Sequence, residues 1–133
     1  MNKSTKKFVD DRLHNYKISI YDVYDADTIT VDIDLGFGVV LQKQKVRLSR
    51  INAYEVTRRK GTTQIQKLRG IAGRDWLAAQ LCFAMTNKET IFIRSSVKRV
   101  RGKFGRILGE LYIGSRNIND ELVKLEYAKY QEY

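Results

Sequence analysis

Two short runs of alternating apolar and polar residues, joined by an acidic turn, constrain the fold of this chain more than any other feature. Ile18 and Ile20 lie two residues apart, and residues 28 to 35 repeat the alternation with Ile29, Val31, Ile33 and Leu35. Alternation of this kind puts apolar side chains on one face of a β-strand. The connection, Asp25-Ala26-Asp27, contains aspartates, which support tight turns through backbone hydrogen bonds. The pattern therefore predicts a hairpin with one buried face.

After residue 61 the spacing of the apolar residues changes. Between Thr62 and Met85 they recur at steps of three and four, at Ile65, Leu68, Ile71, Ala72, Trp76, Ala79 and Phe83. This spacing is typical of an amphipathic helix. Gly70 and Gly73 each lower helix propensity by about 1 kcal/mol relative to alanine. We therefore expect packing to hold this helix, and a close approach to the sheet is one reason for glycine at these positions.

The predicted order of elements is three strands, one long helix, two strands and one short helix. The third strand covers residues 39 to 51, the last two cover 89 to 97 and 106 to 113, and Asn117 or Asn119 caps the short helix. This order favours a mainly β (α+β) fold, a five-stranded OB-fold Greek-key barrel with the long helix after strand three. No linker composition divides the chain, so we expect an N-terminal extension (1–15) and one OB-fold domain (16–133).

The overall composition excludes several kinds of chemistry. The chain has one cysteine and one histidine, which rules out intramolecular disulfides, Cys/His zinc sites and mechanisms that need two histidines. Any catalysis must use carboxylates, Lys, Arg, Tyr or a metal ion. The 25 Lys and Arg against 15 Asp and Glu give a net charge of +10, which favours a polyanionic partner.

The charges are also unevenly distributed along the chain. Residues 22 to 34 contain five acids and no base, whereas residues 43 to 106 contain seventeen bases against Glu55, Asp75 and Glu89. An acidic turn beside a basic region fits a cation site next to a phosphate-binding surface. The alternative is two solvated faces without a ligand.

The sequence contains no apolar stretch of the length of a secretory signal or a membrane span. We therefore expect a cytoplasmic protein without a membrane partner. No oligomer-forming pattern is evident, so a monomer without a protein partner is expected.

Five residues are candidates for chemistry. Asp25 and Asp27 could present oxygens to one hard cation, although such aspartates also bond their own backbone. Arg47 lies in a strand-like run and fits a phosphate, or is simply an exposed cation. Glu55 is a lone acid among bases. It either neutralises these bases or accepts a proton from an attacking water. Arg106 starts a strand, where it is held more rigidly than its loop neighbours.

Four segments together resemble the staphylococcal (micrococcal) nuclease family, also called thermonuclease-like. They occur in the family's order and spacing, and the similarity extends from about Lys17 to Lys129; the segments are Val23–Ile29, Val46–Glu55, Lys103–Arg106 and Ile118–Val123. The resemblance implies an OB-fold barrel with packed helices. It also implies calcium-dependent hydrolysis of DNA and RNA.

Roles follow from the resemblance position by position. Asp27 matches a calcium carboxylate, and Asp25 is a nearby acid of the same turn. Arg47 and Arg106 match two arginines that clamp the scissile phosphate. Glu55 matches the carboxylate that acts on the attacking water.

This chain departs from the family's pattern at three positions. Asn52 replaces a second calcium carboxylate, so we expect weaker calcium binding, because affinity follows the number of charged ligands. Ala53 would still offer its backbone carbonyl to the metal. Tyr54 replaces a proline. The loss of the rigid φ of proline loosens the placement of Glu55, the next residue. Phe104 is the third departure, since it keeps only the ring of the family's tyrosine. Its neighbour Lys103 matches a lysine that contacts a substrate phosphate.

The leading hypothesis is a calcium-dependent nuclease acting on DNA or RNA, single-stranded or frayed. The alternative is a nucleic-acid-binding OB-fold domain that is catalytically weak or inactive. Asn52 and Tyr54 are the direct evidence for this alternative. Both hypotheses predict binding that weakens with salt, so salt dependence does not separate them.

Overall fold

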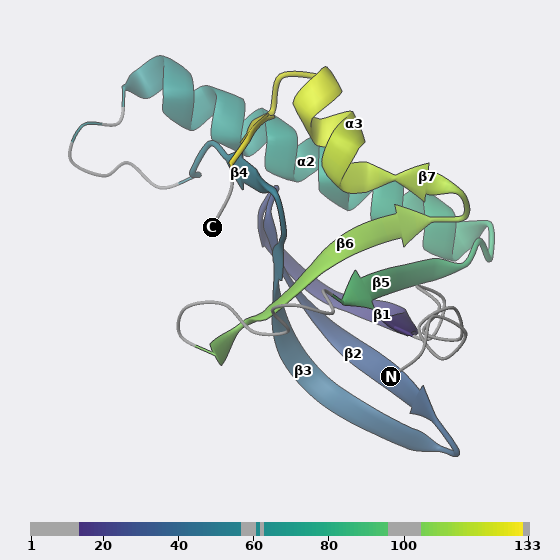
Figure 1. The fold of residues 1–133 in the computed structure, drawn as a ribbon. Coiled ribbons are helices and arrows are strands. Elements are labelled where there is room, and N and C mark those ends of the chain that lie inside the picture. Colours follow the sequence, from purple (N-terminus) through teal and green to yellow (C-terminus); the bar gives the residue numbers. More distant parts are fainter. Residues whose placement is uncertain (1–13, 57–60, 62, 96–104, 132–133) are drawn as a thin grey trace, which may run out of the picture.

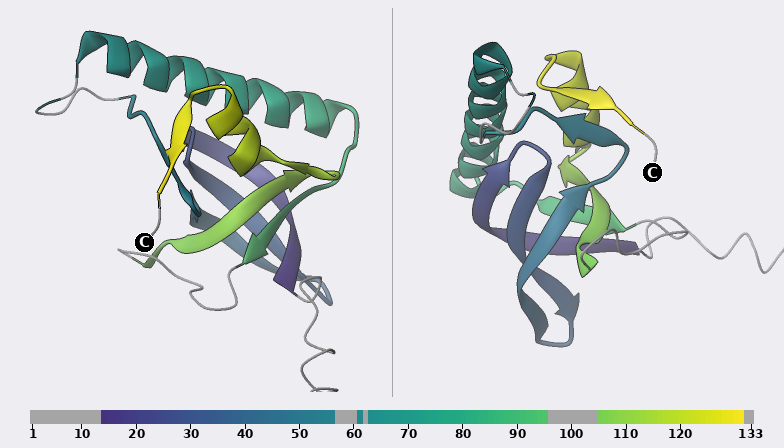
Figure 2. Two further views of the ribbon diagram at one scale, coloured as in Figure 1. Left: turned by 45° about the horizontal axis from the view of Figure 1, so that its top comes forward. Right: turned by 90° about the vertical axis from the view of Figure 1, so that its left-hand side faces the viewer.

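A computed structural model describes residues 14–56, 61, 63–95 and 105–131. In chain order its elements are β1 (Asn15–Asp25), β2 (Thr28–Gly36), β3 (Val39–Leu48), β4 (Ile51–Ala53), α2 (Gln64–Thr86), β5 (Ile91–Ser95), β6 (Ile107–Ile113), β7 (Arg116–Asn117), α3 (Ile118–Lys124) and β8 (Ala128–Tyr130). The long helix and the short C-terminal helix are confirmed. Both lie at one end of the molecule, opposite the β2–β3 turn (Figure 1, Figure 2).

Five strands form a closed barrel. The sheet order is β3-β2-β1-β5-β6, and a parallel pairing of β3 with β6 closes the ring, with Val46 opposite Ile107 and Leu48 opposite Gly109. All other pairs in the ring are antiparallel. This arrangement confirms the predicted mainly β fold with a five-stranded OB-type barrel.

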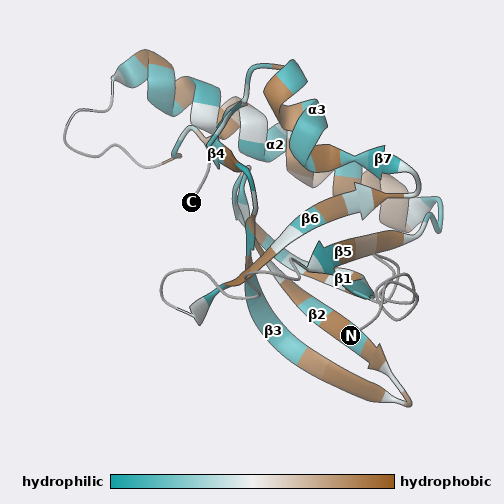
Figure 3. Ribbon diagram, in the orientation of Figure 1, coloured by the Kyte–Doolittle hydropathy of each residue, from teal (hydrophilic) through white to brown (hydrophobic). Residues whose placement is uncertain are grey.

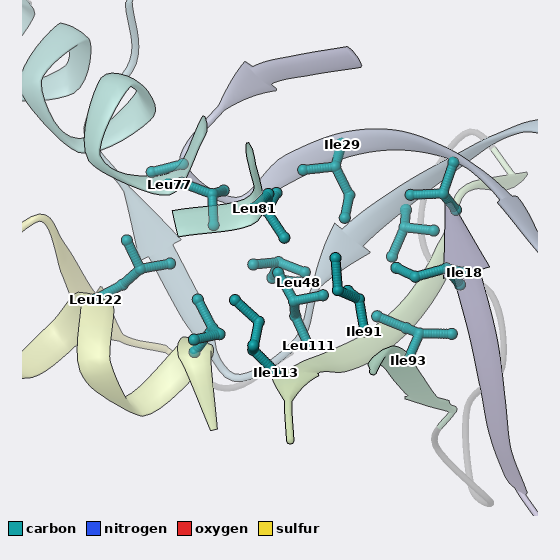
Figure 4. Packing of buried hydrophobic residues seen from close by; sticks show 14 of the residues in the cluster. Ile18, Ile29, Leu48, Leu77, Leu81, Ile91, Ile93, Leu111, Ile113 and Leu122 are labelled. Atoms are coloured by element: carbon teal, nitrogen blue, oxygen red, sulfur yellow. The ribbon is translucent and has the colours of Figure 1, made fainter. Parts of the chain in front are cut away.

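The alternation of apolar residues correctly identified the buried face of the first hairpin. Ile18 pairs with Ile33 across β1 and β2, and both are buried. Ile29 and Val31 are also buried, whereas Leu35 is exposed. The core continues through Leu48, Ile91, Leu111 and Ile113 of the other strands and is covered by Leu77 and Leu81 of α2 (Figure 4).

The face through which α2 packs differs from the predicted one. The helix begins at its Thr63 N-cap, close to the expected start, but its buried residues are Gly70, Gly73, Leu77, Leu81 and Ala84. Of the residues expected to face the core, Ile65, Leu68 and Phe83 are 56–72% exposed. The reason is that small residues bring the helix axis close to its neighbours, and the buried stripe then follows the glycines rather than the bulkiest side chains.

The predicted third strand is broken in two. β3 ends at Leu48, a turn follows at Ser49 and Arg50, and β4 then pairs with β8 in a separate two-stranded sheet. Arg50 has φ = 66°, a left-handed conformation that redirects the chain. The break turns the segment after β4 across the end of the barrel, next to the β1–β2 turn.

Two asparagines organise the C-terminal region, and only one of them is a cap. Asn117 caps α3 by accepting the Asp120 N–H. Asn119 is fully buried: its Oδ1 accepts the Leu111 N–H (3.0 Å) and its Nδ2 donates to the Ser49 carbonyl (2.8 Å). The side chain of Asn119 thus joins α3, β6 and the turn after β3.

In the described part of the chain, neither helix combines the length and the apolar character needed to cross a membrane.

Candidate functional site

The sheet register brings Asp27 and Arg47 together. Asp27 follows β1 in the β1–β2 turn, and Arg47 lies near the end of β3, where it pairs with Thr28. The Leu48 N–H donates to the Asp27 carbonyl at 2.8 Å, which joins the turn to the end of β3. These two side chains, twenty residues apart, therefore become neighbours at one end of the barrel.

Asp27 is 5% exposed and its carboxylate has three partners. Oδ2 accepts the Ala53 N–H at 2.7 Å and lies 3.3 Å from Nη2 of Arg47. Oδ1 accepts the Thr28 hydroxyl at 3.0 Å. A buried carboxylate is tolerated when it is paired and hydrogen-bonded in this way. The alternative that this aspartate bonds mainly its own turn is wrong, because its strongest contact is to β4.

Arg47 is not an exposed strand cation, since it is 8% exposed. Its Nη1 donates to the carbonyls of Leu48 (2.7 Å) and Ile51 (2.9 Å), and its Nη2 donates to Oδ1 of Asn52 (3.3 Å). These acceptors lie at the end of β3 and in β4, on either side of the turn at Ser49 and Arg50. The group is therefore fixed in one orientation, with both of its Nη atoms against protein oxygens.

The predicted metal ligands partly gather around the same guanidinium. Oδ2 of Asp27 and Oδ1 of Asn52 each lie 3.3 Å from Nη2 of Arg47, and Ala53 follows Asn52 in β4. Carboxylate, amide and carbonyl oxygens are the ligands that a hard divalent cation takes, so the donor set fits calcium in kind. It carries one carboxylate charge, and no group of three His, Cys, Asp or Glu residues suited to a metal occurs within the described ranges.

Asp25 has a different structural role. Its side chain is buried, and Oδ1 accepts the Val56 N–H at 3.1 Å. This bond attaches the segment after β4 to the end of β1. Asp25 therefore helps to hold Glu55, the residue before Val56.

Glu55 is half-buried and lies directly against α2. A Cβ at Gly70 would lie 2.6 Å from the Glu55 carbonyl carbon, closer still to its oxygen, and 2.8 Å from the Tyr54 carbonyl oxygen. Side chains do not approach backbone atoms this closely, so only glycine fits here. A close approach of the helix was expected at the sheet, but the partner of Gly70 is the segment after β4 that carries Glu55.

Tyr54 is held by contacts in place of the ring constraint of a proline. The guanidinium of Arg69 lies 5.2 Å from the centre of the Tyr54 ring, and its Nη1 is 3.4 Å from the hydroxyl. The Tyr54 N–H donates to the Tyr127 carbonyl. Arg69 was not a candidate in the sequence, because the only signal for it is its position one residue before the glycine that touches Glu55.

Arg106 was expected to start a strand, but β6, the strand that pairs with β3, begins one residue later at Ile107. It directly precedes Ile107, the partner of Val46 in the closing strand pair. Its Nε is buried and has no hydrogen-bond partner among the described residues. A buried donor of this kind is unfavourable until an acceptor binds, and a phosphate oxygen would supply one. Lys103 and Phe104, the predicted substrate contacts, lie outside the described residues.

Part of the basic region is neutralised by acids that lie outside it in the sequence. Arg50 pairs with Glu110 and Asp120. Burial lowers the pKa of Arg50, but the hydrogen bonds to Glu110 and Asp120 outweigh it and raise the pKa overall. Arg116, which lies outside this region, is paired with Glu121 in the same way. Charges counted along the sequence thus overstate the number of cations available to a phosphate.

A comparison of the chain with models of protein families found no match, and a comparison with curated proteins found none either.

Proposed function

We propose that this chain is a divalent-cation-dependent nuclease that hydrolyses phosphodiester bonds in single-stranded or frayed DNA or RNA, as its resemblance to the micrococcal nuclease family implies. The observation that carries the proposal is the buried ion pair of Asp27 and Arg47, which lies beside Asn52 at the end of the barrel. Well-packed apolar residues of similar volume often stabilise a protein as well as a buried ion pair does, so the pair favours a role beyond stability.

The two arginines would bind the phosphate. Charge builds up on the equatorial oxygens as phosphorus becomes five-coordinate, and fixed cations in a partly buried site stabilise it without reorganising. Arg47 is fixed by two backbone carbonyls, and the buried Nε of Arg106 has no hydrogen-bond partner among the described residues, so it would gain one from a phosphate oxygen.

Glu55 would accept a proton from the attacking water or orient it. A general base contributes only if its position is fixed relative to the phosphate. Three neighbours support that position: the Arg69 contact to Tyr54, the Asp25 contact to Val56 and the glycine surface of α2.

Asp27, Asn52 and the Ala53 carbonyl would hold the cation, which when bound supplies further charge neutralisation at the phosphate. Because one carboxylate serves this cluster, we expect calcium binding to be weak.

The second candidate function is nucleic-acid binding without cleavage. It is favoured by the uncharged Asn52 and by the position of Arg47, whose Nη2 contacts the oxygens of both Asp27 and Asn52. In this case the guanidinium itself supplies the positive charge between those oxygens.

Cleavage of single-stranded DNA separates the two candidates. The wild-type protein is incubated with calcium, magnesium or manganese, and with chelator. Glu55→Gln and Arg106→Ala are compared with the matched surface variants Glu89→Gln and Arg74→Ala. We expect each site variant to lose about 10²-fold or more in rate, with the surface variants unchanged. If the substrate stays intact with every metal, the nuclease function is excluded and nucleic-acid binding without cleavage remains. If all variants cleave at equal rates, the assignment of the site is contradicted.

A calcium titration tests the metal ligands directly. Asn52→Asp restores a second charge, so calorimetry should show tighter calcium binding than in the wild type, with Asn87→Asp at the end of α2 as the control. If Asn52→Asp binds calcium no better than Asn87→Asp, then residue 52 does not line a metal site.

A further inference from the structure

The turn of the β2–β3 hairpin exposes an uncharged, apolar surface. Residues 35 to 41, here called the apolar tip, contain no charged side chain. Five of them are large hydrophobic residues with 37% or more of their surface exposed: Leu35, Phe37, Val39, Val40 and Leu41. The hairpin extends away from the barrel at the end opposite the helices, and apolar residues continue along both strands to the turn (Figure 1, Figure 3).

Phe37 occupies a backbone conformation that does not suit it. Its φ is 56°, and it lies between Gly36 (φ 82°) and Gly38 (φ 76°). Turns of this kind favour Asn-Gly, and a bulky residue in the left-handed region is a genuine outlier. The ring is fully exposed, so no described part of the chain compensates for the strain. Strain kept without an internal benefit points to a use outside the molecule.

A second copy of the chain does not fit this surface well. Beyond its contact with β6, the described part of β3 pairs only with β2. That outer edge carries Lys43 and Lys45, and Lys43 (φ 50°) lies at a shift in register between β2 and β3. Bulges and edge lysines oppose the addition of a further strand. The net charge of +10 also opposes self-association.

Nucleic acid does not fit the tip either, because phosphates are bound by cations and the tip has none. Lipid fits better. The turn begins at Phe37, three residue steps beyond Asp34, and at about 3.3 Å per step this gives a reach of about 10 Å. This reach matches the depth of roughly 5–10 Å at which interfacial segments bury their apolar face.

The residues behind the tip suit the polar side of a membrane interface. The Lys43 ammonium lies 5.1 Å from the centre of the exposed Tyr21 ring. Lysine and tyrosine both place an apolar stem in the interface and a polar end in water. The nearby carboxylates of Asp32 and Asp34 accept the backbone N–H groups of Lys43 and Gly36, respectively. The net positive charge adds attraction to anionic headgroups.

We propose that the apolar tip inserts into the surface of membranes containing anionic lipids. The expectation of no membrane partner depended on the absence of a spanning segment, and a hairpin that enters only the headgroup region needs none. The proposal does not depend on the nuclease function, since it uses neither the metal ligands nor Glu55.

Vesicle sedimentation tests the proposal. The wild type should bind mixed phosphatidylserine–phosphatidylcholine vesicles more tightly than pure phosphatidylcholine vesicles. Phe37→Asn should reduce this binding about tenfold or more, whereas the matched exposed-phenylalanine variant Phe83→Asn on α2 should not. Asparagine suits the turn, so Phe37→Asn keeps its fold. As a second measurement, the fluorescence of Phe37→Trp should shift to shorter wavelength on vesicles, unlike that of Phe83→Trp.

Three results would overturn the proposal. The first is equal vesicle binding by the wild type and Phe37→Asn. The second is a concentration-dependent dimer that Phe37→Asn abolishes, which would assign the tip to a second copy. The third is weaker binding of single-stranded DNA by Phe37→Asn without any vesicle binding by the wild type, which would assign the tip to nucleic acid.

Discussion

Replacing Gly70 with alanine tests whether α2 fixes the position of Glu55. A Cβ at residue 70 would lie 2.6 Å from the Glu55 carbonyl carbon and 2.8 Å from the Tyr54 carbonyl oxygen. Ordinary contacts between such atoms are about 3.5 Å, so the helix and the segment must separate by about 1 Å. All the atoms concerned belong to the backbone, and no flexible side chain can move aside.

The size of the effect follows from two opposing terms. Alanine is favoured over glycine inside a helix by about 1 kcal/mol. Overpacking of a well-packed site is unfavourable by about 1–3 kcal/mol, and the backbone contact puts Gly70 in the upper half of that range. Gly70→Ala should therefore lower the free energy of unfolding by about 1–2 kcal/mol. Gly73→Ala should leave it within about 0.5 kcal/mol, because the new Cβ would lie 3.0 Å from Cβ of Tyr127 and 3.4 Å from Cβ of Ala26, so the neighbours move by only a few tenths of an ångström and the smaller overpacking cost offsets the gain in helix propensity.

Urea unfolding of both variants, followed by far-ultraviolet circular dichroism, measures this difference. If the proposed function holds, Gly70→Ala should also slow DNA cleavage, since it displaces Glu55. The reasoning is refuted if Gly70→Ala is as stable as the wild type, or at least as stable as Gly73→Ala. In that case helix propensity alone decides and the close contact does not exist.

Three further outcomes are expected. Asn119→Ala should lower the free energy of unfolding by about 2–4 kcal/mol in urea, because the buried Leu111 N–H and the part-buried Ser49 carbonyl lose their partners. Arg47→Ala should lower it by about 3–5 kcal/mol, because it leaves the Asp27 charge buried and unpaired, and Arg47→Lys should restore part of the loss. The hydrogen bond to Asp120 raises the pKa of Tyr130 above its ordinary 10.0. The small stabilising effect of this bond is therefore present below pH 10.0 and is lost as the pH rises through the raised pKa. In Asp120→Asn, ultraviolet titration should show Tyr130 ionising at lower pH than in the wild type.

The sequence predicted the strands of the barrel well, because a period of two directly reports which face is buried. It predicted the existence of α2 but not the face that packs. Gly70 and Gly73 carry no hydropathy signal, whereas Ile65 and Leu68 carry a strong one and lie exposed. The break at Arg50 was also not predictable, since arginine has no preference for the left-handed backbone it adopts there.

For the candidate site, residue chemistry predicted the members but not their contacts. Asp27 and Arg47 were both candidates, yet their pairing depends on the register of β2 with β3. The position of Glu55 depends on α2, which packs against it through Gly70. The expected loosening at Tyr54 did not take the contact between Arg69 and the Tyr54 ring into account. Such contacts arise from tertiary packing, which no local pattern in the chain reports.

The parallel pairing of β3 with β6 has a consequence for the order of folding. β1, β2 and β3 follow one another as hairpins, so their contacts form between residues close in the chain, whereas Val46 meets Ile107 only after about sixty residues of intervening chain are arranged. Slow non-local contacts are thus concentrated at the closure of the barrel. Arg47 and Asp27 meet within the early hairpins, but Arg106, which directly precedes β6, is brought beside β3 only at closure. If the proposed function holds, phosphate binding in a refolding experiment should therefore return with the last kinetic phase, after most β-structure has formed.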